Sequence, residues 1–113
     1  MYIIKAENAC NSAFQISISF YLCVMNTVHL EISGEVQGVF FRATAKEIAK
    51  RHKILGWIKN TFDDKVEALI TGEKEDIEKF ISWCKQGPEK ANVENVIITN
   101  AEFQFFNGFE VIR

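Results

Sequence analysis

The sequence predicts a single α+β domain in which two helices cover one face of an antiparallel sheet. Short segments whose apolar residues alternate with polar ones indicate strands, and two segments whose apolar residues recur every three or four positions indicate helices. The predicted order is strand, helix, strand, strand, helix, strand, strand. That order matches a split βαβ arrangement.

The first strand and the first helix follow an atypical N-terminal segment. Val28, Leu30 and Ile32 alternate with polar residues and predict a strand that ends near Gly34. Apolar residues at helical spacing then predict a helix over residues 43–52. Basic residues concentrate at the C-terminal end of that helix, where the helix dipole favours them.

A hairpin and a second helix come next. Strands are predicted over residues 55–60 and from Val66 onward, joined by a turn at residues 62–64. Acidic residues near Glu73 and an apolar period of 3.6 predict a second helix, which Gly87 and the following proline end.

Two further strands are expected over residues 93–100 and 108–112. The segment between them is rich in phenylalanine. Because it lacks interleaved arginine or lysine, we expect these rings to pack in the core and at the sheet edge, not to stack on nucleic acid bases. They are Phe103, Phe105, Phe106 and Phe109.

Composition and charge exclude several classes of protein. The chain has 113 residues, 48% hydrophobic and 25% charged, which is typical of one globular domain. A net charge of −2 gives the protein no positive electrostatic potential that would attract polyanions, so we expect no nucleic acid partner. Cys10, Cys23 and Cys84 lie far apart without a CxxC pair, which indicates reduced thiols in a cytoplasmic protein and no metal site. Cys84 is expected to be a small buried residue of the second helix.

Residues 1–24 differ in character from the rest of the chain. No charged residue occurs from Asn8 to Val28, yet polar residues interrupt the segment. Its longest apolar run is far shorter than a membrane-spanning helix requires, so we expect no membrane association. Alternation from Phe14 to Phe20 is compatible with a strand. We interpret residues 1–24 as an extension to which the sequence assigns no role, and residues 25–113 as the domain, with Met25 as a candidate start.

The candidate functional site lies where the first strand meets the first helix. Backbone amides of a glycine-containing turn can converge, and a helix N-terminus adds free N–H groups, so this turn is a candidate anion site. Arg42 favours that interpretation, because a cation near the positive end of a helix is unfavourable unless an anion lies between them. A guanidinium also binds phosphate or carboxylate through two parallel hydrogen bonds. The alternative is an arginine paired with a surface carboxylate. The chain here reads Gly34-Glu35-Val36-Gln37-Gly38-Val39-Phe40-Phe41-Arg42.

Asn60 ends the second predicted strand and is a second candidate. Its side-chain amide offers an acceptor and donors with which to hold a water molecule. The alternative is a turn residue without a catalytic role.

These residues resemble the acylphosphatase family. The resemblance covers about residues 27–113. It implies a ferredoxin-like split βαβ fold and hydrolysis of the carboxyl-phosphate bond of acyl phosphates without metal or other cofactor. The residues that carry it are the run V-Q-G-V-F-F-R that ends at Arg42, Gly56-Trp57 with Asn60 and Asp63, and Gly87-Pro88.

The resemblance also implies a role for each candidate residue. Arg42 clamps the substrate phosphate and Asn60 orients the attacking water. No Cys, Asp, Ser or His lies in residues 36–42, which leaves direct attack by water. A carboxylate leaving group needs no general acid, so we expect little activity on ordinary phosphate monoesters. The residues whose backbone binds the phosphate are Gln37, Gly38, Val39, Phe40, Phe41 and Arg42.

One position departs from the family pattern, and two other functions remain open. The family hairpin reads N-T-x-D-G-x-V, but Asp64 stands here in place of the glycine, which leaves the turn geometry open. The alternatives to a hydrolase are a non-catalytic module that binds RNA or protein on the same fold and a carbamoyl-phosphate-handling module of a larger system. We expect a monomer whose partner is a small-molecule acyl phosphate.

Overall fold

The structure, a computed structural model, describes residues 25–113. The extension expected over residues 1–24, with its candidate strand, lies outside the described residues. The order of the described elements confirms the split βαβ arrangement. They are β1 (Met25–Glu35), α3 (Phe41–Arg51), β2 (Leu55–Asn60), β3 (Val66–Glu73), α4 (Lys74–Gln86), β4 (Asn92–Ala101) and β5 (Phe109–Ile112).

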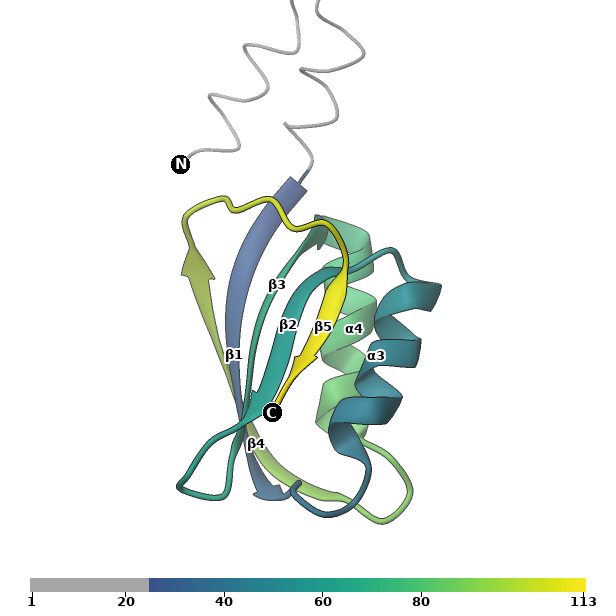
Figure 1. Ribbon diagram of the computed structural model, residues 1–113, viewed down its shortest axis with the longest axis vertical. Helices are drawn as coiled ribbons and strands as arrows, with labels where there is room; N and C mark the ends of the chain where they lie inside the picture. Colours follow the sequence, from purple (N-terminus) through teal and green to yellow (C-terminus); the bar gives the residue numbers. More distant parts are fainter. Residues whose placement is uncertain (1–24) are drawn as a thin grey trace, which may run out of the picture.

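The strands form one sheet in the order β4-β1-β3-β2-β5, and both helices lie on the same face of it (Figure 1). The pairs β1–β4, β1–β3 and β2–β3 are antiparallel, but β2 and β5 are parallel. The predicted antiparallel sheet is therefore confirmed for three of its four strand pairs, and the β2–β5 edge is parallel. The chain crosses the sheet between β4 and β5 over residues 102–108, so β5 runs opposite to β4 and in the same direction as β2 (Figure 1).

Buried polar groups fasten this crossing segment to the sheet. Thr27 of β1 faces Thr71 of β3, and their Oγ1 atoms lie 2.7 Å apart. The backbone amide of Gln104 donates to Thr27 Oγ1 at 2.9 Å, and the backbone carbonyl of Gln104 accepts from Thr71 Oγ1 at 2.8 Å. Because these bonds satisfy buried hydroxyl groups, they stabilise the position at which β5 begins.

The core lies between the sheet and the helices. Val28, Leu30 and Ile32 are buried, which confirms the predicted core face of the first strand. Cys84 is also buried among apolar residues, as expected. That burial raises the pKa of the Cys84 thiol, because the thiolate form would lose its hydration.

The first helix begins earlier than predicted because of a tertiary contact. Helix α3 begins at Phe41, not at Ala43 as predicted. The Phe41 ring is buried, and its centroid lies 5.1 Å from that of Trp83 in α4. This contact between the two helices stabilises the first turn of α3. The apolar periodicity within α3 could not predict it, because Trp83 belongs to another helix.

The phenylalanines after β4 only partly follow the prediction. Phe109 packs against the core and Phe106 is half-buried. Phe103 and Phe105 are 41% and 61% exposed, so the expectation that they pack was wrong. Both flank Gln104, whose hydrogen bonds hold the crossing segment on the surface of the sheet.

The hairpin between β2 and β3 resolves the question raised by Asp64. The Thr61 amide donates to the Lys65 carbonyl oxygen at 2.9 Å and closes the turn. Asp64 has a φ of 68°, in the left-handed region that glycine adopts without strain. Thr61 Oγ1 also donates to the carboxylate of Asp63, and this hydrogen bond lowers the pKa of Asp63.

Candidate active site

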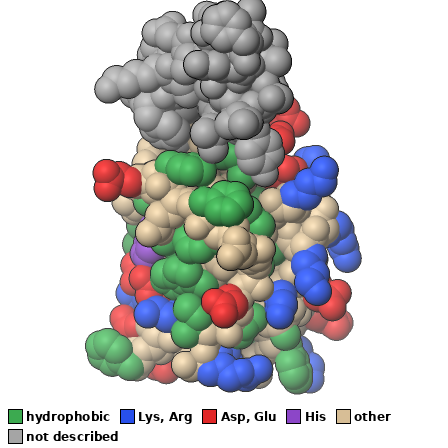
Figure 2. Space-filling view, turned by 45° about the horizontal axis from the view of Figure 1, so that its top comes forward, with side chains coloured by type: hydrophobic (Ala, Val, Ile, Leu, Met, Phe, Trp, Pro, Cys, Tyr) green, Lys and Arg blue, Asp and Glu red, His purple; other side chains and the backbone are tan. Residues whose placement is uncertain are grey.

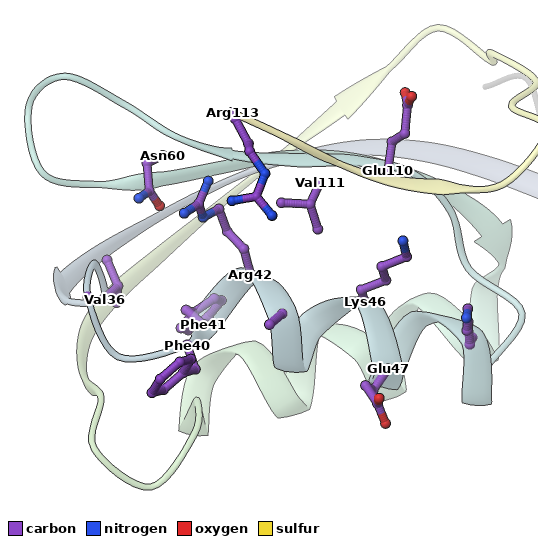
Figure 3. A pocket seen from close by; sticks show the side chains of 13 residues that line it. Val36, Phe40, Phe41, Arg42, Lys46, Glu47, Asn60, Glu110, Val111 and Arg113 are labelled. Atoms are coloured by element: carbon purple, nitrogen blue, oxygen red, sulfur yellow. The ribbon is translucent and has the colours of Figure 1, made fainter.

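A cavity of about 670 Å³ opens between α3, the end of β2 and β5 (Figure 3). Its lining includes Gly38, Phe40 and Arg42 from the β1–α3 loop and the start of α3, and Asn60 from β2. The structure thus brings together the two segments that the sequence indicated separately. Three further basic residues also line it: Lys46 and Lys50 from α3, and Arg113 after β5.

The loop between β1 and α3 presents free backbone donors. Gly38 and Phe40 have positive φ angles of 75° and 63°. Among hydrogen bonds within residues 25–113, none has a backbone N–H of residues 37–42 as its donor. Successive free amides that lead into a helix N-terminus form a suitable anion site.

The start of α3 is strained and has no protein cap. Phe40 is the residue before the helix and adopts the left-handed conformation, which costs a bulky residue roughly 1–2 kcal/mol. No side chain caps α3, and its first turn contains no acidic residue. Helix α4, in contrast, has Glu75 and Asp76 in its first turn. The positive end of the α3 dipole is therefore available to an anion in the cavity.

Gln37 and Val39 are not among the residues that line the cavity. The Gln37 side-chain nitrogen donates to the carbonyl oxygens of Thr61 and Lys65, both at 2.8 Å. Val39 packs against the core. Gln37 therefore braces the loop against the hairpin that follows Asn60, a structural role that its position in the motif did not indicate. Participation of the Gln37 and Val39 amides in phosphate binding stays a prediction.

The Arg42 side chain lies in the cavity beside Arg113 (Figure 3). Its Nη1 donates to the carbonyl oxygen of Ile112 at 3.3 Å. None of the salt bridges within residues 25–113 involves Arg42. The alternative of a surface ion pair is thus not found among the described residues, and the guanidinium charge is free to bind a ligand.

Asn60 lies at the end of β2, close to the guanidinium groups (Figure 3). Its Oδ1 is buried and has no hydrogen bond donor among the described residues. Leaving a buried acceptor unpaired costs about 1–3 kcal/mol. The residue Asn60 lines the cavity, and its side-chain amide offers both an acceptor and donors to a water molecule.

Three basic residues of the cavity, Lys46, Lys50 and Arg113, were not predicted to be functional from the sequence. Lys46 follows Arg42 by one i,i+4 step on α3, so the helical pattern contained a usable signal for it. Arg113 carried no such signal. It reaches the cavity because β5 pairs with β2.

Residues 25–113 contain no group of three or more His, Cys, Asp or Glu side chains arranged to hold a metal ion. None of the helices in that range has both the length and the apolar character needed to cross a membrane.

Comparison with known proteins identifies relatives of this chain. The family model described as Acylphosphatase matches residues 28–111. An acylphosphatase from Thiobacillus denitrificans is 41% identical over 86 residues, which are 76% of this chain and 96% of the relative. The solved structure of an acylphosphatase from Coxiella burnetii matches with a TM-score of 0.76 at 33% identity, over 78% of this chain and 93% of that chain.

A longer protein contains a similar region. The solved structure of T. kodakarensis HypF matches with a TM-score of 0.70 at 30% identity over 78% of this chain. The match covers 12% of that longer chain.

Proposed function

The chain belongs to the acylphosphatase family of hydrolases, and on that premise we propose that it hydrolyses acyl phosphates by direct attack of water on a phosphoryl group held by backbone amides and Arg42. The products are a carboxylate and inorganic phosphate. One observation carries the proposal: a single cavity is lined by residues of the loop with free amides, Gly38 and Phe40, by Arg42 in the uncapped first turn of α3, and by Asn60.

The amides of residues 37–42 and the Arg42 guanidinium bind the non-bridging oxygens of the phosphoryl group. In phosphoryl transfer the transition state is loose, and its charge is spread over these oxygens. Donors already in place stabilise that charge without reorganisation during the reaction. The positive φ of Phe40 supports this role, because a strained backbone persists only where the surrounding structure imposes it, and this loop conformation leaves the amides free.

Asn60 positions the nucleophile. Its Oδ1 accepts a hydrogen bond from the attacking water, and the water oxygen forms a bond to phosphorus on the side opposite the acyl oxygen. The bond between phosphorus and the acyl oxygen breaks, and its electron pair leaves with the carboxylate. A phosphate oxygen takes the proton of the water, because a neutral amide cannot act as a base.

The leaving group determines the substrate class. A carboxylate is stable as an anion at neutral pH, so its departure requires no general acid. An alkoxide from an ordinary phosphate monoester requires protonation. The proposed site therefore acts on acyl phosphates and leaves monoesters almost untouched.

Hydrolysis of benzoyl phosphate in the presence of a metal chelator tests this proposal. We expect turnover to continue with the chelator present and inorganic phosphate to inhibit competitively, because both ligands occupy the same amides. An alkyl phosphate monoester is the matched control and should show almost no turnover. Loss of activity in chelator, or non-competitive inhibition by phosphate, would contradict the proposed mechanism.

A further inference from the structure

A row of basic side chains leads from the β1–α3 loop along α3. Arg42, Lys46 and Lys50 are spaced four residues apart, so they lie on one side of the helix, and all line the cavity. Arg113, after the end of β5, lines the cavity from the sheet side (Figure 3). Lysine and arginine side chains are also numerous on the α3 side of the molecule in Figure 2.

Within residues 25–113, no salt bridge neutralises any of these basic side chains. The carboxylates that line the cavity do not approach them in Figure 3: Glu47 points away from β5, and Glu110 projects from the other side of β5 than Arg113. The space between α3 and β5 is therefore basic.

Lys46 is an exposed residue that differs from Lys50 in its position along α3. Lys50 lies in the last turn of α3, where the helix dipole favours a cation. Lys46 lies in the middle of α3, and like charges four residues apart destabilise a helix. A bound anion would offset that repulsion.

The direction of attack places the acyl part of the substrate next to Lys46. In an in-line reaction the leaving group departs on the side opposite the attacking water. Asn60 and Lys46 lie on opposite sides of Arg42 (Figure 3). Lys46 is one four-residue step from Arg42, about 6 Å along the helix axis, which is the span of a short acyl chain.

We propose that the space between α3 and β5 is a second anion site, in which Lys46 and Arg113 bind an anionic group on the acyl part of the substrate. This inference rests on the proposed function and narrows its substrate class: short acyl phosphates that carry a second carboxylate or phosphoryl group are preferred over neutral ones.

Substrates of equal chain length and different charge test the second anion site. Succinyl phosphate ends in a carboxylate, 3-phosphonopropanoyl phosphate ends in a phosphonate, and butyryl phosphate ends in a methyl group. We expect the full-length protein to show a KM for at least one charged substrate that is about fivefold lower than for butyryl phosphate. The charged substrate with the lower KM identifies the second group as a carboxylate or a phosphoryl group.

Substitution of Lys46 assigns the effect to this site. Lys46→Met and Arg113→Gln should each raise the KM for the preferred charged substrate by about threefold to fivefold. Lys46→Met should change neither the KM for butyryl phosphate nor the kcat for either substrate. Because Arg113 lies beside Arg42 (Figure 3), Arg113→Gln is judged by the ratio of the KM values for the charged and the neutral substrate. Lys79→Met, on the exposed side of α4 and outside the cavity lining, is the matched control and should change nothing. Equal KM values for charged and neutral substrates, or an equal change for both in Lys46→Met, would overturn the second anion site.

Binding of non-hydrolysable analogues separates this inference from the proposed function. In these analogues a methylene group replaces the bridging oxygen between the acyl carbon and phosphorus. If the protein hydrolyses none of the three acyl phosphates, the proposed function fails. The second anion site is still judged by calorimetric titration: tighter binding of the charged analogue than of the neutral one, lost in Lys46→Met, supports it, and equal binding overturns it.

Discussion

Arg42 donates a hydrogen bond from Nη1 to the backbone carbonyl oxygen of Ile112, over 3.3 Å. The bond joins the first turn of α3 to β5, the last strand of the sheet. It holds the guanidinium in the cavity, and because its acceptor is a neutral carbonyl group, the positive charge remains available to a ligand.

Replacement of Arg42 by glutamine removes this charge and, because the glutamine side chain is two bonds shorter, also the hydrogen bond to Ile112. We expect kcat/KM for benzoyl phosphate to fall by about 10²- to 10³-fold, because a charged donor to the transition state is lost. Calorimetric titration should show that binding of inorganic phosphate is also lost. Arg51→Gln, at the exposed opposite end of α3, is the matched control and should retain both properties. Phosphate binding of normal strength in Arg42→Gln would rule out the clamping role.

Replacement of Asn60 by alanine should separate binding from turnover. Its Oδ1 makes no hydrogen bond among the described residues, so removal of this oxygen breaks no hydrogen bond within residues 25–113. We expect inorganic phosphate to bind as in the unmodified protein and kcat to fall by about 10²-fold, because the attacking water loses its orientation. Steady-state kinetics and a phosphate titration measure the two effects. Asn100→Ala, exposed on the edge strand β4, provides the comparison, and a full kcat in Asn60→Ala would refute water positioning.

Gly34, near the end of β1, and Gly38, in the loop between β1 and α3, should respond differently to substitution by alanine. An added Cβ at Gly38 meets nothing within 4 Å among the described residues, but at Gly34 it would lie 2.2 Å from the Asn92 carbonyl oxygen. Gly38→Ala should lower the unfolding free energy by about 1 kcal/mol, because φ is positive there. Gly34→Ala should lower it by about 3 kcal/mol or more, because backbone must move. Chemical denaturation measures both values.

Phosphate binding of Gly38→Ala then tests the loop itself. A shift of the backbone at Gly38 redirects the neighbouring amides, so we expect weaker phosphate binding in a protein that still folds. If Gly38→Ala binds phosphate as tightly as the unmodified protein, the left-handed conformation at this position is not required for the anion site.

Substitution of Asp64 by glycine should stabilise the protein. Asp64 is exposed and has a positive φ of 68°, a conformation that glycine adopts without a Cβ penalty. We expect the unfolding free energy to rise by about 0.5 kcal/mol and the melting temperature to rise with it. Asp63→Gly in the same turn should have the opposite effect, because it removes the hydrogen bond from Thr61. A lower melting temperature for Asp64→Gly would show that the left-handed turn is not a source of strain.

Most elements could be predicted from local patterns, and the errors lie where distant segments meet. The alternation of Val28, Leu30 and Ile32 identified a strand face that is indeed buried. The early start of α3 depends on Phe41 and its contact with Trp83, which belongs to another helix. The exposure of Phe103 depends on the path of a segment that crosses the sheet. No pattern within one element reports such contacts.

By itself, the chain's residue order determined the helices, most strand positions and the identity of Arg42 and Asn60 as candidates, because hydrophobic periodicity and motif spacing act over a few neighbouring residues. Only the tertiary structure decided that β5 pairs parallel to β2 and carries Arg113 to the cavity beside Arg42. The position of Arg113 depends on how residues 102–108 pack on the sheet. Contacts between residues far apart in the chain leave no periodic pattern in the sequence of either segment.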